Sequence, residues 1–203
     1  MITIWNFARG ARGVRVAWLC EEMGLPYAMR LVGYPTPAEY RARNPLGTVP
    51  FLEDGDAGIT ESTAMLLHLA SKYGPSPLLP PPDSSAYARV LQMTVLSEAT
   101  LGASLNALLM DRFAVAEAEQ GGALSKMVRA RVEEVLGYVE QVLAAGPYLA
   151  GDAFTVADIA ICTSLGLWRG PAQGTLSKAL TEYHARATSR PAYERAVKAN
   201  AAS

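Results

Sequence analysis

The stretch that decides the fold runs from residue 44 to residue 52 and reads NPLGTVPFL. Pro45 and Gly47 predict a turn, and the Val49-Pro50 step then opens a strand. Proline has no N–H, so at the start of a strand it leaves neighbouring backbone groups available to another partner. If the Val49-Pro50 bond is cis, the N–H and C=O of Val49 can point into a cleft and pair with an extended peptide as an added strand. A trans proline at an ordinary strand edge is the alternative.

A second polar feature stands directly before an apolar helix and reads ITESTA, residues 59–64. Ser62 and its neighbours would offer free backbone N–H groups at the helix start, which suit a carboxylate. Glu61 is an acceptor that could hold an ammonium group. Together they would match the head group of an α-amino acid, and simple helix capping by Ser62 or Thr60 is the alternative.

The segments around these two features predict a small α/β unit of βαβαββα order. The first strand, helix and second strand predict a parallel strand pair joined by a crossover. Strands are expected at residues 2–7, 27–32, 49–53 and 57–60, and the main helices at residues 14–23 and 62–73.

A proline-rich stretch separates this unit from the rest of the chain. Residues 74–83 read GPSPLLPPPD, which cannot form a helix and is interpreted as a semi-rigid linker. Helical signals follow, including a valine stripe from Val128 to Val142 in steps of three and four. We therefore expect an α/β domain over residues 1–74, a linker over residues 75–84 and an all-helical domain over residues 85–203.

Composition excludes several classes of function. Half of the 203 residues are hydrophobic and 18% are charged, which suits a globular core rather than disorder. The net charge of -1 leaves no strong field to attract nucleic acid or an anionic membrane. No basic region precedes an apolar run at the N-terminus, and no apolar stretch approaches the roughly 20 residues that span a bilayer. We expect neither a signal peptide nor a membrane partner.

The cysteines and histidines point to a reduced protein with no metal site. Cys20 and Cys162 are the only cysteines and both stand in apolar helical surroundings, so a cytoplasmic location is expected. His68 and His184 have no plausible metal-ligand companions. A third polar segment reads YLAGDAFTVAD, residues 148–158, in which Thr155 and Asp158 have the spacing of a structural capping box.

These three segments, taken in order, resemble the glutathione transferase superfamily. Its members share an Asn-Pro-x-Gly-x-Val-Pro turn, a Glu/Gln-Ser pair opening the third helix, and a Gly-Asp-x-Thr-x-Ala-Asp capping segment. Residues 18–27 also look like the family's first helix and its exit. The resemblance implies a thioredoxin-like domain followed by a helical-bundle domain, glutathione as co-substrate, a small hydrophobic electrophile, and a homodimer.

By this resemblance, Val49 would pair with the cysteinyl backbone of glutathione, and Glu61 and Ser62 would hold its γ-glutamyl head. Further glutathione contacts are assigned to Thr48, Pro50 and Arg9.

The resemblance weakens where the glutathione sulfur would lie. The family usually has Tyr, Ser or Cys between the first strand and the first helix, but this chain has no Tyr, Ser, Thr or Cys from Ile4 to Leu19. Counting back from residues 21–22 puts Ala8 and Ala11 at that place, and Gly10 or Gly13 under a shifted register.

Three arginines occupy the same gap. Arg9, Arg12 and Arg15 could share one face if the helix starts early. Arg12, beside the predicted helix start, could stabilise a thiolate by charge instead of a hydroxyl. The alternative is that these arginines are solvated, or contact a partner subunit or a glutathione carboxylate.

Two functions remain open. One is a glutathione transferase that uses the thiolate on a small electrophile, and the other is a non-catalytic protein that binds glutathione or hydrophobic ligands with the same fold. Disulfide exchange is disfavoured, because it needs a protein thiol and no Cys stands between the first strand and the first helix. The electrophile pocket is expected between the domains, with candidate residues Phe7, Leu105, Leu108, Leu109, Phe113 and Trp168.

Overall fold

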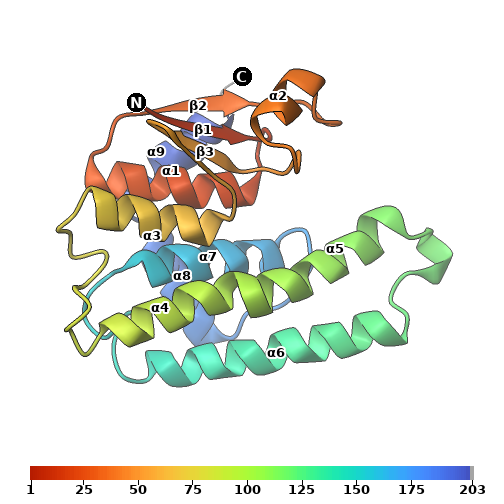
Figure 1. Ribbon diagram of the computed structural model, residues 1–203. Helices are drawn as coiled ribbons and strands as arrows, with labels where there is room; N and C mark the ends of the chain where they lie inside the picture. Colours follow the sequence, from red (N-terminus) through yellow and green to blue (C-terminus); the bar gives the residue numbers. More distant parts are fainter. Residues whose placement is uncertain (202–203) are drawn as a thin grey trace. The chain divides into compact units, whose positions relative to one another are not determined.

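The computed structural model describes residues 1–201 (Figure 1). The chain forms two compact units. The first combines residues 1–79 with the chain from residue 188 onward, and the second spans residues 80–187. Each unit is described by itself below.

The first unit is built on a four-stranded sheet in the order β2-β1-β3-β4. Strands β1 (Ile2–Asn6) and β2 (Tyr27–Leu31) are parallel, which confirms the predicted crossover. Strands β3 (Phe51–Asp54) and β4 (Ala57–Ile59) form an antiparallel hairpin, and β3 also pairs antiparallel with β1. The result is a small mixed sheet of the thioredoxin-like kind.

Within the described residues, four helices belong to this unit. Helix α1 (Ala11–Met23) provides the crossover and ends at Gly24, whose left-handed φ of 65° suits the predicted stop. Helices α2 (Ala38–Arg43) and α3 (Ser62–Lys72) follow in the order that the sequence predicts. The fourth, α9 (Pro191–Ala201), comes from the far end of the chain.

The position of α9 corrects the predicted domain of residues 85–203. Figure 1 shows α9 beside α1, and the rings of Trp18 and Tyr193 meet with centroids 4.7 Å apart. Arg190 Nε lies 2.6 Å from the carboxylate of Glu22. These pairs join residues about as far apart as the chain allows, so no local pattern in the sequence reveals them.

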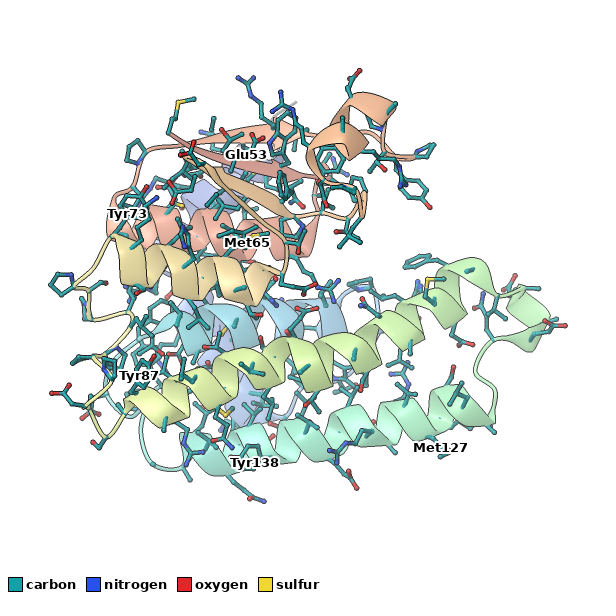
Figure 2. All side chains as sticks on the ribbon, in the orientation of Figure 1. Glu53, Met65, Tyr73, Tyr87, Met127 and Tyr138 are labelled. Atoms are coloured by element: carbon teal, nitrogen blue, oxygen red, sulfur yellow. The ribbon has the colours of Figure 1, made fainter. Side chains whose placement is uncertain are left out.

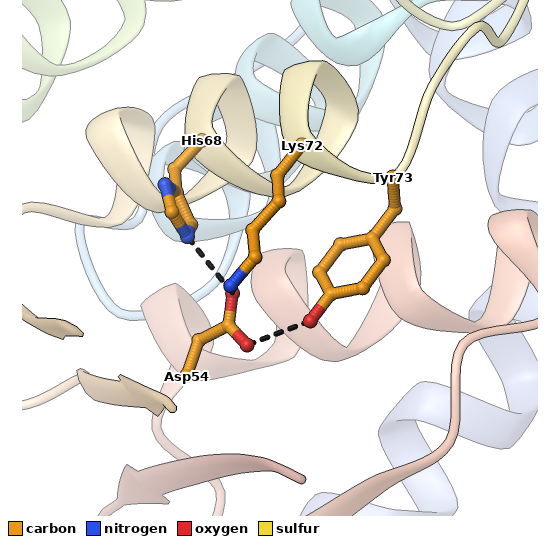
Figure 3. Close-up of polar contacts among 4 residues, drawn as sticks. All are labelled: Asp54, His68, Lys72 and Tyr73. Carbon is orange, nitrogen blue, oxygen red and sulfur yellow. Dashed lines mark hydrogen bonds and ion pairs between the residues drawn. The ribbon is translucent and has the colours of Figure 1, made fainter. Parts of the chain in front are cut away.

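A buried carboxylate ties β3 to the last turn of α3 (Figure 3). Asp54 accepts hydrogen bonds from Lys72 Nζ at 2.8 Å and from Tyr73 Oη at 2.6 Å, and His68 Nε2 lies 2.9 Å from it. Burial alone would raise the pKa of Asp54, but the bonds from Lys72, Tyr73 and His68 outweigh it and lower the pKa to about 2. The charged carboxylate therefore anchors one end of α3.

The second unit is helical. Its elements are α4 (Tyr87–Leu96), the π-helix η1 (Ser97–Gly102), α5 (Ala103–Ala114), the 3₁₀-helix η2 (Glu117–Glu119), α6 (Ala123–Leu143), α7 (Val156–Arg169) and α8 (Lys178–Thr188). Helices α4, η1 and α5 form one continuous run, α5 packs against α6, and α4 packs against α7.

The predicted capping box and valine stripe are confirmed in this unit. Thr155 and Asp158 form the reciprocal capping box at the start of α7, and Tyr183 Oη donates to Asp158 at 2.8 Å. Val132, Val135 and Val139 bury one face of α6. Residues 74–83 contain no helix or strand, as their prolines predict.

One helical run, Tyr87–Ala114, is long and apolar enough to cross a membrane by length and composition alone, unlike the sequence-based expectation. Several of its apolar side chains, including Val90, Met93 and Leu105, are fully buried. That burial is typical of the core helix of a globular unit.

Candidate functional site

Strand register brings the two predicted polar features together in the first unit. In the β3–β4 hairpin, Leu52 pairs with Ile59, so Val49 and Pro50 directly precede β3 at the same end of the hairpin at which Glu61 follows β4. Trp5 pairs with Phe51 across β1 and β3, which brings the end of β1 to the same edge. Val49, Pro50, Glu61 and Ser62, called the cradle below, therefore lie near one end of the sheet.

The backbone of Val49 is available to a ligand. The Val49-Pro50 bond is cis, which decides between the two alternatives that the sequence left open. Within residues 1–201, no hydrogen bond occupies the N–H or C=O of Val49. Its side chain packs against a cluster of Val32, Tyr40 and Phe51. The packing of this side chain thus holds the N–H donor and the C=O acceptor of Val49 in place.

The turn before Val49 is fixed by buried polar groups. The C=O of Thr48 accepts hydrogen bonds from Tyr40 Oη and from Asn44 Nδ2, the latter at 2.8 Å. Gly47 has a φ of 64°, and a Cβ there would lie 2.7 Å from Arg41 Cζ. Sequence analysis found this motif but not the roles of Tyr40 and Asn44, which depend on a hydrogen-bond pattern that residue types alone do not specify.

Glu61 occupies a strained position at the start of α3. Its φ of 66° and ψ of 101° are rare for a residue with a side chain, and such strain clusters at functional sites. Helix α3 has no side-chain hydrogen bond at its N-cap, so the simple capping alternative is wrong. The carboxylate of Glu61 is exposed and its helix start offers backbone N–H groups.

A buried arginine is hydrogen-bonded to Ser62. Arg15 is fully buried, and its Nη1 donates to Ser62 Oγ at 2.9 Å. Arg9, Arg12 and Arg15 could share one helix face only if the helix started early, and that condition is not met. Helix α1 begins only at Ala11, and Arg9 lies before it in a left-handed turn with φ of 59°.

The loop between β1 and α1 carries the residues predicted to lie near the sulfur. Ala8 and Arg9 are exposed, and Arg12 is half-buried in the first turn of α1. Ala11 opens the helix, but its side chain lies outside the described part of the structure. The N-cap is Gly10, which has no side chain to accept hydrogen bonds from the first-turn N–H groups.

Two buried asparagines hold this loop. Asn6 Nδ2 donates to Gly10 O at 2.8 Å and to Asn200 Oδ1 at 2.7 Å, and Asn200 Nδ2 also donates to Gly10 O at 3.2 Å. A Cβ on Gly13 would lie 2.1 Å from the Asn6 side chain, so the helix must carry glycine there. Sequence analysis missed this arrangement, because Asn200 lies 194 residues from Asn6.

The structure corrects part of the predicted electrophile pocket. Leu105 is fully buried, and Trp168 is buried with its Nε1 donating to Thr175 O at 3.0 Å, so both are core residues of the helical unit. Leu108 is nearly buried, and Phe113 is exposed. Phe7 is half-buried with its ring edge-on to Tyr34. Phe7, Leu108, Leu109 and Phe113 stay predictions.

The thiols of the chain are not poised for chemistry. Burial raises the pKa of Cys20 to about 12, with Glu21 and Asp54 adding to the effect. Burial also raises the pKa of Cys162, reinforced by Asp158. A protonated thiol is a poor nucleophile. Among the described residues, no group of three or more His, Cys, Asp or Glu side chains could hold a metal ion.

Fold and site together define a class: a thioredoxin-like unit with an open backbone cradle, followed in the chain by a helical unit. Comparison with known proteins identifies the family. The model "Glutathione S-transferase, N-terminal domain" matches residues 8–77, and "Glutathione S-transferase, C-terminal domain" matches residues 109–195. Glutathione S-transferase 3 of Zea mays is 32% identical over 200 residues, covering 92% of this chain and 88% of the maize protein.

Solved structures agree. A glutathione transferase from Methylococcus capsulatus has a TM-score of 0.85 at 26% identity, with 98% of each chain covered. A theta class glutathione S-transferase from Xanthomonas axonopodis pv. citri, solved with glutathione bound, has a TM-score of 0.82 at 29% identity, covering 97% of this chain and 96% of that one. This chain belongs to the glutathione S-transferase family.

Proposed function

We propose that this chain is a glutathione transferase that presents the thiolate of glutathione to a small hydrophobic electrophile. One observation carries the proposal: the unoccupied backbone N–H and C=O of Val49 stand just before β3, at the end of the hairpin where the strained Glu61 follows β4. The glutathione bound to the Xanthomonas relative supports the choice of ligand.

The cradle would hold glutathione by its backbone and its γ-glutamyl head. Val49 would pair with the cysteinyl residue as an added strand. The carboxylate of Glu61 would take the ammonium group, and the first N–H groups of α3 at Ser62 would take the carboxylate. The buried charge of Arg15 below Ser62 adds attraction for that carboxylate. Thr48, Pro50 and Arg9 are proposed as further contacts.

The sulfur would be stabilised without a hydroxyl. Ala8 and Ala11 supply none, so the proposal assigns the role to the first-turn N–H groups of α1 and to the charge of Arg12. Lowering a thiol pKa from about 8.5–9 to about 6.5 needs roughly 3 kcal/mol. The thiol proton leaves to solvent, the sulfur lone pair forms the C–S bond, and the leaving group departs with its bonding electrons.

The test is to bind glutathione and titrate the ultraviolet absorbance of its thiolate. We expect a bound pKa below that of free glutathione, raised again in Arg12→Ala and largely restored in Arg12→Lys. The exposed Arg131 provides a control, and Arg131→Ala should leave the value unchanged. An unchanged value in Arg12→Ala removes Arg12 from the mechanism.

The second candidate is a non-catalytic protein that binds glutathione or hydrophobic ligands. The observation that favours it is the absence of any Tyr, Ser, Thr or Cys from Ile4 to Leu19. The same titration separates the two functions: a bound thiol pKa no lower than that of free glutathione supports binding alone and contradicts the transferase.

A homodimer and a cytosolic location complete the proposal. Apolar side chains stand exposed on α5 and at the start of α6, where an interface between two copies would cover them. They are Met110, Phe113, Leu124 and Met127, the last labelled in Figure 2, and each is at least 62% exposed. Sedimentation should show a dimer for the native chain and a monomer for Leu124→Lys combined with Met127→Lys.

A further inference from the structure

The helical unit contains a second pocket, lined by no residue of the glutathione cradle. It has a volume of about 280 Å³, near the lower limit of roughly 300 Å³ for small-molecule sites. Its walls come from the end of α5, the start of α6 and the residues after α7. Three of the lining side chains are cations: Arg112, Lys126 and Arg129.

The walls of this pocket are held in place by contacts within the unit. The guanidinium of Arg129 lies 5.0 Å from the ring centroid of Trp168, and its Nη2 donates to Ala172 O at 3.1 Å. Gln120 Nε2 donates to Arg112 O at 3.0 Å. The side chain of Arg129 is thus held in place, while the guanidinium of Arg112 lies 5.6 Å from the ring centroid of Phe113.

The side chains that line the pocket carry a net positive charge. Among the described residues that line the pocket, Asp111 is the only carboxylate, and it already accepts a hydrogen bond from Gly121 N at 3.0 Å. Within residues 1–201, no ion pair joins Arg112 or Lys126 to a carboxylate. Three cationic side chains and one carboxylate leave the lining with an excess of two positive charges, which favours an anion as ligand.

We propose that this pocket binds a small dianion, either a dicarboxylate or a phosphate. Arginine forks match the paired oxygens of both groups, and lysine adds a point charge. The apolar wall formed by Leu108 and Ala172 suits a short carbon chain between two carboxylates. The proposal rests on the helical unit alone and does not depend on glutathione binding.

Indole signals provide a local test with the full chain. The chain has three tryptophans, of which only Trp168 stacks on a pocket arginine. Each indole N–H gives one signal in a ¹H–¹⁵N spectrum, and Trp168→Phe identifies its own. Succinate and inorganic phosphate are titrated separately against potassium chloride at matched ionic strength. We expect the Trp168 signal to shift saturably, while the signals of Trp5 and Trp18 stay in place.

Variants decide whether the cations of the pocket are responsible. Arg112→Gln and Lys126→Gln should each weaken the apparent affinity about tenfold. Arg131→Gln and Lys178→Gln remove the same charge from paired surface sites and should have no such effect. A response to one anion only identifies the ligand chemistry within the proposal. Equal weakening by all four variants, or an equal response to chloride, overturns it.

Discussion

The guanidinium of Arg15 lies fully buried in the first unit, 2.9 Å from the hydroxyl oxygen of Ser62. A buried cation is costly unless its donors are satisfied. The proposed binding residue Ser62 is therefore also part of the interior of the unit, and its loss should affect stability and binding together.

Ser62→Ala should lower the free energy of unfolding by about 1–3 kcal/mol, because a buried guanidinium loses an acceptor. Retention on immobilised glutathione should fall as well. Ser71→Ala, at the exposed end of the same helix, is the matched control and should change neither. Wild-type stability in Ser62→Ala would contradict the supporting role of the Arg15 pair.

Glu61→Gly should separate stability from binding. Relief of the positive φ should raise the free energy of unfolding by about 1 kcal/mol, while loss of the carboxylate should weaken glutathione retention. Gln173 has a φ of 55° in the helical unit, so Gln173→Gly should gain stability in the same way without losing retention. Urea unfolding and affinity chromatography measure the two effects, and unaltered retention in Glu61→Gly would discredit the cradle.

Gly13→Ala should destabilise the first unit although alanine favours helices. The new Cβ would lie 2.1 Å from Asn6 Cγ, and overpacking of this kind costs about 1–3 kcal/mol. Gly137, in the middle of α6, has no atom within 4 Å of such a Cβ, so Gly137→Ala should instead gain about 0.5–1 kcal/mol. Thermal unfolding of the two variants should shift in opposite directions, and a shift in the same direction would show that Asn6 can give way.

Asp54 should make stability depend on acid. Its pKa is lowered to about 2 in the folded chain, so its contribution is present above the unfolded value near 3.8 and is lost as pH falls from about 4 toward 2. Asp54→Asn should cost about 2 kcal/mol at pH 7 and progressively less in that window. Asp56→Asn, in the exposed hairpin turn, is the control. A cost that does not change with pH would assign the effect to packing.

The two cysteines should be inert in the native protein. Both are buried with raised pKa values, so an aromatic disulfide reagent should label neither thiol until the chain unfolds. Titration of the released chromophore with and without denaturant measures this. Labelling of one thiol in the native state would reopen a disulfide-exchange function.

Local patterns predicted many of the elements of both units. The glycine after Met23 ends α1, the turn near Asp54 joins two strands, and the capping box opens α7, because each depends on residues that are close in sequence. The cradle motif belongs to the same class, since residues 44–52 specify their own turn. The isomer of the Val49-Pro50 bond was not predictable, because tertiary context selects it.

The side-chain contacts that hold the site in place could not be predicted, because their residues lie far apart in the sequence. Arg15 and Ser62 are 47 residues apart, and Asn6 and Asn200 are 194 apart. Side-chain pairs at such separations carry no periodic signature. The one available signal was Arg15 itself, a cation between Val14 and Val16 on a helix whose other residues are mostly apolar. Arg15 is buried and donates to Ser62, and it is not part of a shared arginine face.

The return of α9 to α1 has a consequence for synthesis of the protein. During translation, β1 through α3 are synthesised first and the entire helical unit follows. Helix α9, which carries Tyr193 and Asn200, is synthesised last. Until then the loop that contains Ala8 and Gly10 lacks the hydrogen bonds that Asn200 makes with it. A nascent chain therefore contains Val49, Glu61 and Ser62 well before it contains Asn200, so the loop between β1 and α1 reaches its final hydrogen bonding only after the whole helical unit has been made.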